Sequence, residues 1–309
     1  MGIKHAEVKA EVTRVPGSKL VMGYKPYIKI HSFPQVRCTF WLLAWANGCF
    51  YNCEYCWLKA YRPWPWNEIH VAEKAALAKT IKNFCKKIGG SKLLNAGELC
   101  DSFIAPEYIS FMASTLRQAN MEYGRRHRLL LLTKSADPSV LLQGNFKDVV
   151  VYSVSVNTET TAKQFEHDAP SPMKRIHAAR RIKGAGYEVR VRVDPIIAGS
   201  NPGVRIPAGS EPAYVGLMER ICAFIEPSLI TLGSLRATPR TYRFLPEAIR
   251  AQLTERTPWG RGYPLSTRLS LYNSLITVAK DHDIPVAFCK EPVDVWRSLK
   301  LRPKCNCMP

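Results

Sequence analysis

Strand-like and helix-like segments alternate through most of this 309-residue chain, and that alternation constrains its fold more than any other feature. Six apolar runs predict strands, and amphipathic segments of helical period lie between them. The expected strands are Thr39–Ala46, Lys92–Ala96, Arg128–Thr133, Val149–Ser155, Glu188–Asp194 and Leu229–Gly233. The expected helices are Ala72–Ile88, Pro106–Tyr123, Pro138–Gln143, Pro172–Gly186 and Glu211–Ile225. Strands that alternate with helices form parallel βαβ units, so we expect an α/β fold.

Six strands are two short of a closed eight-fold barrel, so we expect an open, partial barrel with its chemistry at the carboxyl ends of the strands. The first 36 residues are polar and rich in breakers such as Pro16, Gly23 and Pro34, which predicts an irregular N-terminal arm. The expected organisation is an arm over 1–36, a barrel over 37–244 and a C-terminal extension over 245–309. That extension contains a predicted helix, Ser266–His282, a predicted strand, Pro285–Phe288, and a cysteine-bearing tail.

The chain carries 44 Lys and Arg against 25 Asp and Glu, a net charge of +19. Such a charge attracts polyanions, and basic clusters along the whole chain favour a nucleic-acid partner over a merely solubilising surface. The longest apolar run, Thr39–Ala46, is shorter than the roughly 20 residues of a membrane span, and the N-terminus has no apolar export signal. We therefore expect no membrane partner and a cytoplasmic location, where the ten cysteines act as ligands or buried thiols.

Three cysteines, Cys49, Cys53 and Cys56, lie within eight residues just after the first predicted strand. Thiolates select zinc, copper or iron–sulfur centres. No fourth ligand stands nearby, so an iron–sulfur cubane on this loop would keep one iron open to an amino-carboxylate ligand. A zinc knuckle, or three unrelated buried thiols, are the alternatives.

This cysteine spacing resembles that of the radical S-adenosylmethionine (SAM) superfamily. The resemblance implies a [4Fe–4S] cluster whose open iron binds SAM and whose electron cleaves it to a 5′-deoxyadenosyl radical. Further segments, in order along Cys38–Pro292, are similar to spore photoproduct lyase and its "DNA repair photolyase" relatives, which implies a partial (β/α)6 barrel. These segments are Asn95–Asp101, Thr133–Ser135, Ser153–Asn157, Ser171–Ile176, Ala185–Tyr187 and Asp194–Ile196.

The same resemblance implies roles for individual residues. Tyr55 would lie near the SAM adenine, as a cofactor-binding and catalytic candidate, and Lys134 and Ser155 would hold the SAM carboxylate and ribose region. Glu98, in a Gly-Glu turn, would meet the SAM ammonium group. Asn157 is two residues after Ser155 and so points to the same face of the sheet, where it can share the site. A solvated lysine and a plain surface turn are the alternatives for Lys134 and Glu98.

The chain departs from the lyase pattern at the cysteine that donates a hydrogen atom. Aligned on Asp101, that cysteine falls on Glu98, while Cys100 takes the place of a serine. Trp57 stands where the lyase has a tyrosine. A carboxylate cannot donate a hydrogen atom as a thiol does, so Cys100 is the catalytic candidate here. Reversal of a thymine lesion and rearrangement of a modified thymine both stay open.

Three further cysteines, Cys289, Cys305 and Cys307, lie near the C-terminus. They are interpreted as a second metal or cluster site, as catalytic thiols that return a hydrogen atom to a product radical, or as an unstructured redox-active tail.

The stretch Trp57–Trp66 interleaves aromatic and basic residues, a pattern that suits base stacking and phosphate binding, with a packed rim as the alternative. Arg236 and Arg240 follow the sixth strand and are predicted phosphate contacts at the barrel mouth. The nucleic-acid candidates are Trp57, Lys59, Arg62, Trp64, Arg236 and Arg240.

These features together predict a radical SAM enzyme that acts on a thymine-derived base in DNA and takes electrons from a one-electron reductant such as flavodoxin or ferredoxin. Because a base in a duplex is shielded, it must be flipped out or already single-stranded. An RNA- or tRNA-modifying radical SAM enzyme, and a non-catalytic nucleic-acid-binding protein with structural zinc, are the alternatives.

Overall fold

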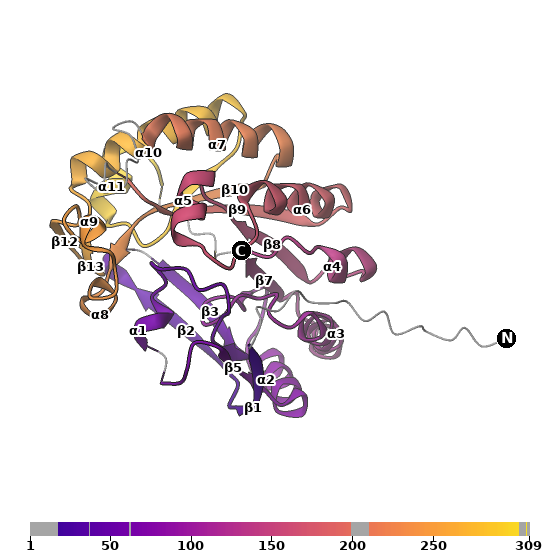
Figure 1. The fold of residues 1–309 in the computed structure, drawn as a ribbon. Coiled ribbons are helices and arrows are strands. Elements are labelled where there is room, and N and C mark those ends of the chain that lie inside the picture. Colours follow the sequence, from indigo (N-terminus) through magenta and orange to yellow (C-terminus); the bar gives the residue numbers. More distant parts are fainter. Residues whose placement is uncertain (1–17, 37, 62, 199–209, 303–306, 308–309) are drawn as a thin grey trace.

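The computed structural model describes residues 18–36, 38–61, 63–198, 210–302 and 307. An eight-stranded sheet curls through the molecule as an open half-barrel (Figure 1). Neighbouring strands are parallel, except that β2 runs antiparallel to β3. The strand order is β14 (Val286–Phe288), β10 (Leu229–Ser234), β9 (Glu188–Ile196), β8 (Val150–Ser155), β7 (Arg128–Thr133), β6 (Leu93–Asn95), β3 (Cys38–Ala44) and β2 (Tyr27–Phe33).

The six predicted strands all form, and a helix follows each in the expected alternation, so the α/β partial-barrel prediction is confirmed. Successive side chains of a strand point to opposite faces, and here both faces are covered. Leu129 and Leu131 of β7 pack in the large core under the helices, whereas Leu130 packs in a smaller core inside the sheet. The outer helices are α2 (Lys74–Lys87), α3 (Pro106–Tyr123), α4 (Ser139–Gln143), α6 (Pro172–Gly184), α7 (Ser210–Ile225) and α10 (Leu265–Asp281) (Figure 1).

Local signals fix where two of these helices begin and end. Pro106 and Pro172 occupy the first turns of α3 and α6, where a missing N–H costs no hydrogen bond. The Ser171 hydroxyl accepts the N–H of Lys174 and so caps α6. Gly124 ends α3 at φ +62°, a conformation that glycine adopts without strain.

The expectation of an irregular N-terminal arm is wrong for the part that the structure describes. β1 (Lys19–Tyr24) pairs with β5 (Glu68–Ala72), which also pairs with β4 (Ala46–Asn47), and β2 forms an edge of the main sheet. Both arm strands are largely exposed or half-buried, so they lack the apolar run that marks a central strand. Pairing with distant strands, rather than local preference, stabilises them.

The main sheet crosses both predicted domain boundaries, because β2 precedes residue 37 and β14 follows residue 244. In the C-terminal part, α10 and β14 match the predicted helix and strand to within one residue at each end. Besides the strands of the arm and β4 and β5, further elements that were not predicted are short: α1 (Leu58–Tyr61), α5 (Glu159–Phe165), β11 (Arg236–Ala237), α8 (Pro239–Tyr242), α9 (Glu247–Arg250), β12 (Glu255–Thr257), β13 (Gly260–Gly262) and α11 (Val293–Ser298).

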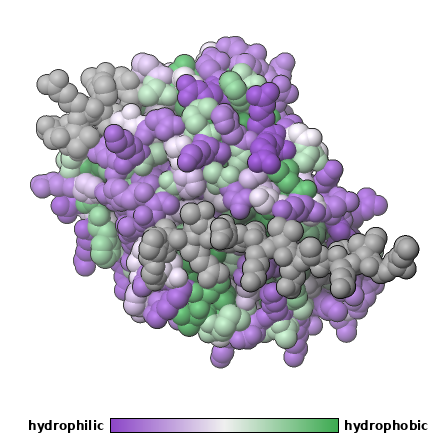
Figure 2. Space-filling model, turned by 45° about the vertical axis from the view of Figure 1, so that its right-hand side comes forward, coloured by the Kyte–Doolittle hydropathy of each residue, from purple (hydrophilic) through white to green (hydrophobic). Residues whose placement is uncertain are grey.

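None of the described helices combines the length and the apolar character that crossing a bilayer requires. Hydrophilic residues predominate on the face drawn in Figure 2, in keeping with the net charge of +19.

Candidate active site

A cavity of about 530 Å³ opens at the carboxyl ends of the parallel strands. The ends of parallel strands meet at one edge of a sheet, which is why segments far apart in the sequence share this space. Its wall includes the cysteine loop after β3, the turn after β6 and the ends of β7 to β10 and β14. Among the lining residues are Cys49, Cys53, Tyr55, Cys56, Trp57, Glu98, Cys100, Lys134, Ser155, Arg192, Asp194, Arg236, Cys289, Lys290 and Cys307.

The loop of Cys49, Cys53 and Cys56 begins at Gly48, whose φ of +119° favours glycine. The Gly48 N–H donates to the Leu99 carbonyl at 2.9 Å, which joins the cysteine loop to the turn after β6. All three thiols line the cavity. Burial raises their pKa values, that of Cys53 to about 12, so a cation is needed to hold them as thiolates.

The donor set suits an iron–sulfur cluster, because such clusters are held by cysteine thiolates and each thiolate binds its own iron. In the described part of the chain, no three His, Cys, Asp or Glu side chains gather closely enough to hold one metal ion. Three thiols spread along one loop and facing one cavity fit the corner irons of a cubane.

A buried carboxylate, Glu166, lies behind the cysteine loop and was not singled out from the sequence. It accepts the hydroxyl of Tyr55, and its other oxygen lies 2.6 Å from an Arg175 guanidinium nitrogen. Burial by itself raises the pKa of Glu166, but Lys134 and Arg175 lower it below its usual value, so the carboxylate is charged. Arg175 is completely buried on α6.

The Lys134 ammonium group lies between Ser155 and Glu166. It donates to the Ser155 hydroxyl at 3.0 Å and lies 3.9 Å from Glu166 Oε1 and 5.7 Å from the centre of the Tyr55 ring. Burial lowers the pKa of Lys134, but Glu166 and Cys53 more than offset this, and the amine stays charged. The structure thus gathers Tyr55, Lys134 and Ser155 at one wall beside the cysteine loop.

Glu98 lies on the cavity wall and forms an ion pair with Lys290, at 3.3 Å. Burial raises the pKa of Glu98, while Lys290 and Arg192 lower it, with a net shift below its usual value. The pair joins the turn after β6 to the segment after β14.

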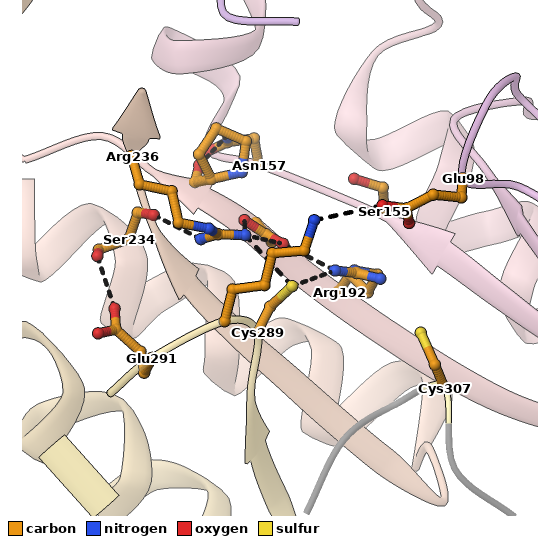
Figure 3. A network of polar contacts seen from close by, with 12 residues as sticks. Glu98, Ser155, Asn157, Arg192, Ser234, Arg236, Cys289, Glu291 and Cys307 are labelled. Atoms are coloured by element: carbon orange, nitrogen blue, oxygen red, sulfur yellow. Dashed lines mark hydrogen bonds and ion pairs between the residues drawn. The ribbon is translucent and has the colours of Figure 1, made fainter. Parts of the chain in front are cut away.

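A second polar network lies beside that pair (Figure 3). Arg192 and Arg236 contact Asp194 at 2.8 and 3.3 Å, and both donate to the sulfur of Cys289, at 2.7 and 3.2 Å. Arg236 was predicted as a phosphate contact at the mouth; it lines the cavity, and its guanidinium group is paired with a buried carboxylate. That carboxylate belongs to Asp194, 42 residues away in the sequence.

Asn157 was predicted to share the cofactor site, and its amide makes three hydrogen bonds within the protein. It donates to the Pro195 carbonyl at 2.9 Å and accepts from the Tyr214 hydroxyl at 2.8 Å and from the Thr158 N–H at 3.0 Å. It is buried and lies outside the residues that line the main cavity. Its role here is to tie the end of β8 to β9.

Cys100 and Cys307, two further described thiols at the cavity, differ in surroundings. The Cys100 thiol donates to the Ala96 carbonyl at 3.5 Å, and Cys307 accepts from the Asn95 amide at 3.4 Å. Cys307 packs in the apolar cluster inside the sheet, with Phe40 among its neighbours. Cys305 lies outside the described residues.

The aromatic stretch divides between cavity and surface. Trp57 lines the cavity and is exposed, whereas Trp64 lies outside the lining and stacks on His70 at 4.0 Å. Lys59 lies 5.2 Å over the Trp66 ring. The guanidinium carbon of Arg240 lies 5.5 Å from the centre of the Tyr61 ring. This contact joins α1 to α8 at the mouth of the cavity. Arg62 lies outside the described residues.

An aromatic wall of the cavity was not predicted. Phe33 and Phe40 lie on the paired strands β2 and β3, and Trp259 packs on Phe33 with ring centres 4.4 Å apart. The aromatic residues Tyr27, His31 and Phe33 are separated by even numbers of residues, as side chains on one face of a strand are. This spacing is the sequence signal that could have predicted the aromatic wall.

Several known proteins are similar to this chain in sequence and in fold. A family model for spore photoproduct lyase matches residues 5–205. Curated spore photoproduct lyases of Clostridium acetobutylicum and Bacillus subtilis are 27% identical over 159 residues and 26% identical over 240 residues. These alignments cover 50% and 72% of this chain, but only 46% and 66% of the two relatives.

Two solved structures share the fold. One is a spore photoproduct lyase complexed with dinucleoside spore photoproduct, with a TM-score of 0.66, 20% identity, and coverage of 88% of this chain and 83% of that one. The other is a mutant lyase with bound AdoMet and dinucleoside spore photoproduct, also with a TM-score of 0.66 and 20% identity, and coverage of 87% and 82%.

Proposed function

Because the chain belongs to the spore photoproduct lyase family, we propose that it is a radical SAM enzyme that acts on a thymine-derived base in DNA. One observation carries the proposal: the three-thiol loop and the group of Tyr55, Lys134 and Ser155 line the same cavity at the strand ends. A cavity of about 530 Å³ has the size of a small-molecule site.

Cys49, Cys53 and Cys56 would hold a [4Fe–4S] cluster, and Tyr55, Lys134 and Ser155 would hold SAM. When bound, this pair would supply a 5′-deoxyadenosyl radical through one-electron cleavage of SAM, with the electron from a donor such as flavodoxin or ferredoxin. The protein's own part is to bind and orient. Lys134 offers a fixed positive charge to a carboxylate, and Glu166 holds the Tyr55 ring through its hydroxyl. Glu98, already paired with Lys290, is the proposed partner of the SAM ammonium group.

The mouth of the cavity supports a nucleic-acid substrate. Trp57 is 37% exposed and Tyr61 43% exposed, and Arg240 lies over the Tyr61 ring. Exposed aromatic rings beside cations can stack bases and hold phosphates. A base must leave the duplex stack to enter such a cavity. Mass spectrometry of the product nucleoside distinguishes a repaired thymine from a modified one.

The test is anaerobic reconstitution with iron and sulfide, followed by incubation with SAM, a reductant and oligonucleotides that carry deuterated thymine derivatives. We expect about four irons per chain, as one cubane requires, and deuterium in the 5′-deoxyadenosine formed. Mass spectrometry of the nucleosides then identifies the product. About eight irons would indicate a second cluster near the C-terminal cysteines.

Matched controls separate the alternatives. Single-stranded RNA and tRNA replace DNA in parallel reactions, and deuterium transfer only from RNA would reject the DNA assignment. A colourless protein that binds zinc and does not cleave SAM would reject the enzyme. Cys222→Ala serves as the matched cysteine variant, because Cys222 is buried on α7 and does not line the cavity.

A further inference from the structure

Besides the cysteine loop, four described thiols line the cavity: Cys38, Cys100, Cys289 and Cys307. The S–H bond of a thiol is weak compared with most C–H and O–H bonds. A carbon radical formed in this cavity would therefore take a hydrogen atom most easily from a thiol. The surroundings of the four sulfur atoms differ enough to choose between them.

Cys38 and Cys307 pack in the apolar cluster inside the sheet, and Cys100 is hydrogen-bonded to the backbone. The Cys100 thiol is directed to the Ala96 carbonyl, next to the end of β6. Cys307 belongs to the apolar cluster inside the sheet, with Leu93, Leu130 and Val151. These contacts suit packing.

Cys289 is held differently. It directly follows β14, and its N–H donates to the Leu232 carbonyl at 2.8 Å, which fixes its backbone to β10. Its sulfur lies between the guanidinium groups of Arg192 and Arg236 (Figure 3). Asp194 holds both arginines, so three charged groups from β9 and β11 fix the position of one thiol.

The segment that carries Cys289 is also pinned to the opposite turn of the cavity. Lys290, the next residue, pairs with Glu98 at 3.3 Å, and its ammonium group lies 4.5 Å from the centre of the Trp259 ring. Cys289 is therefore fixed to a wall that Glu98 and the cysteine loop share, within the same cavity.

The protonation state of Cys289 suits hydrogen-atom transfer. Burial raises the pKa of its thiol to about 11, although Arg192 and Arg236 lower it. The group is thus an S–H at neutral pH, and only the S–H form has a hydrogen atom to give.

We propose that Cys289 is a catalytic residue that returns a hydrogen atom to the carbon radical formed on the nucleotide substrate. This rests on the proposed function, which supplies that radical. In the step, the S–H bond breaks homolytically, a C–H bond forms on the product, and the unpaired electron stays on sulfur. The external one-electron reductant then reduces the sulfur to a thiolate, and a proton from water restores the thiol. Arg192 and Arg236 stabilise the thiolate in between.

The test uses exchange of the thiol proton with solvent. In D₂O, the product of the unaltered protein should carry deuterium at the carbon that held the radical. Cys289→Ser should lose this label and lower product yield about tenfold or more, while 5′-deoxyadenosine still receives deuterium from a labelled substrate. The apo-protein's affinity for the oligonucleotide, measured by fluorescence anisotropy, should stay within about twofold, which a collapsed cavity would not allow.

Three outcomes overturn the proposal: a wild-type product without solvent deuterium, an unchanged product from Cys289→Ser, or loss of the label from Cys38→Ser, Cys100→Ser or Cys307→Ser instead. Cys222→Ser is the control that should keep label and yield. If the wild-type protein transfers no deuterium into 5′-deoxyadenosine, the proposed function itself fails. If 5′-deoxyadenosine still receives deuterium and only the solvent label in the product is missing, the proposed function stands and only the role of Cys289 fails.

Discussion

Two buried carboxylates in this protein each lie between two cations, and they differ in what they hold. Glu166 lies between Arg175 and Lys134 and accepts the hydroxyl of Tyr55, a ring beside the cysteine loop. Asp194 lies between Arg192 and Arg236, two arginines that donate to the thiol of Cys289. The first group positions the proposed cofactor side of the cavity, and the second positions a thiol for the proposed substrate side.

The two groups also differ in how many of their residues lie within the stretch that the family model matches. Every residue of the Glu166 group falls within the matched residues 5–205, whereas Arg236 and Cys289 follow them. The proposed cofactor side thus lies within the stretch that the family model matches, while the proposed substrate side also draws on segments beyond it. Variants on the two sides would separate their roles.

The largest effect is expected from Cys53→Ala, on the cofactor side. Removal of one of three ligands should abolish cluster binding and lower SAM cleavage by about 10³-fold or more. Iron analysis and 5′-deoxyadenosine formation measure this, with Cys222→Ala as the control. A Cys53→Ala protein that still cleaves SAM would show that the cluster is not on this loop.

The next effect compares the two carboxylates directly. Glu166→Gln leaves the fully buried Arg175 without its charge partner, so we expect a loss of about 3–5 kcal/mol in the free energy of unfolding. Asp194→Asn should lose less, because Arg192 and Arg236 keep some access to solvent. Urea denaturation of the apo-proteins measures both.

Asp148→Asn is the control for this pair, since its partner Arg117 is partly exposed, and the loss should stay below about 1 kcal/mol. Equal losses for Glu166→Gln and Asp148→Asn would contradict the role assigned to Glu166.

A smaller effect is expected from Lys134→Met. Loss of the ammonium group beside Ser155 should raise the KM for SAM about tenfold, with a smaller change in kcat, and Lys134→Arg should recover part of the affinity. Lys163→Met, at an exposed position of α5, is the matched control. A KM unchanged in Lys134→Met would remove this residue from the SAM site.

The pH dependence of stability should report both carboxylates. Burial opposes ionisation, but the flanking cations lower the pKa of Glu166 and of Asp194 below their unfolded values of about 4.3 and 3.9. Their contribution is therefore present above those values and is lost as pH falls through the lower folded values. The melting temperature of the apo-protein should fall below about pH 4, and less steeply in Asp194→Asn. An equally steep fall in that variant would contradict the charged state of Asp194.

The smallest effect is expected at the mouth. Arg240→Ala should weaken oligonucleotide binding a few-fold and lower the slope of log affinity against log salt by about one. Arg181→Ala, at an exposed position of α6, should change neither. Arg236→Ala should act mainly through stability and the Cys289 thiol, because its side chain points inward. A salt slope reduced by Arg236→Ala but not by Arg240→Ala would reverse the assignment of the two arginines.

The strands of the central sheet could be predicted because they are buried on both faces and so read as continuous apolar runs, as in Arg128–Thr133 and Val149–Ser155. The edge strand β2 could not, since about half of its side chains face solvent and its pairing with the distant residues of β3 stabilises it. In the structure, Tyr55, Lys134 and Ser155 line the same cavity as the three-cysteine loop.

The sequence by itself determined the alternating α/β order, the cysteine loop after the first barrel strand and the basic character of the surface. These depend on local pattern and composition, which act over a few residues. Only the tertiary structure decided that Arg236 pairs with Asp194, that Asn157 ties two strands, and that Cys289 lies between two arginines at the cavity wall. Each of these outcomes depends on charges and hydrogen-bonding groups tens of residues apart, and their meeting is fixed by how the sheet curls.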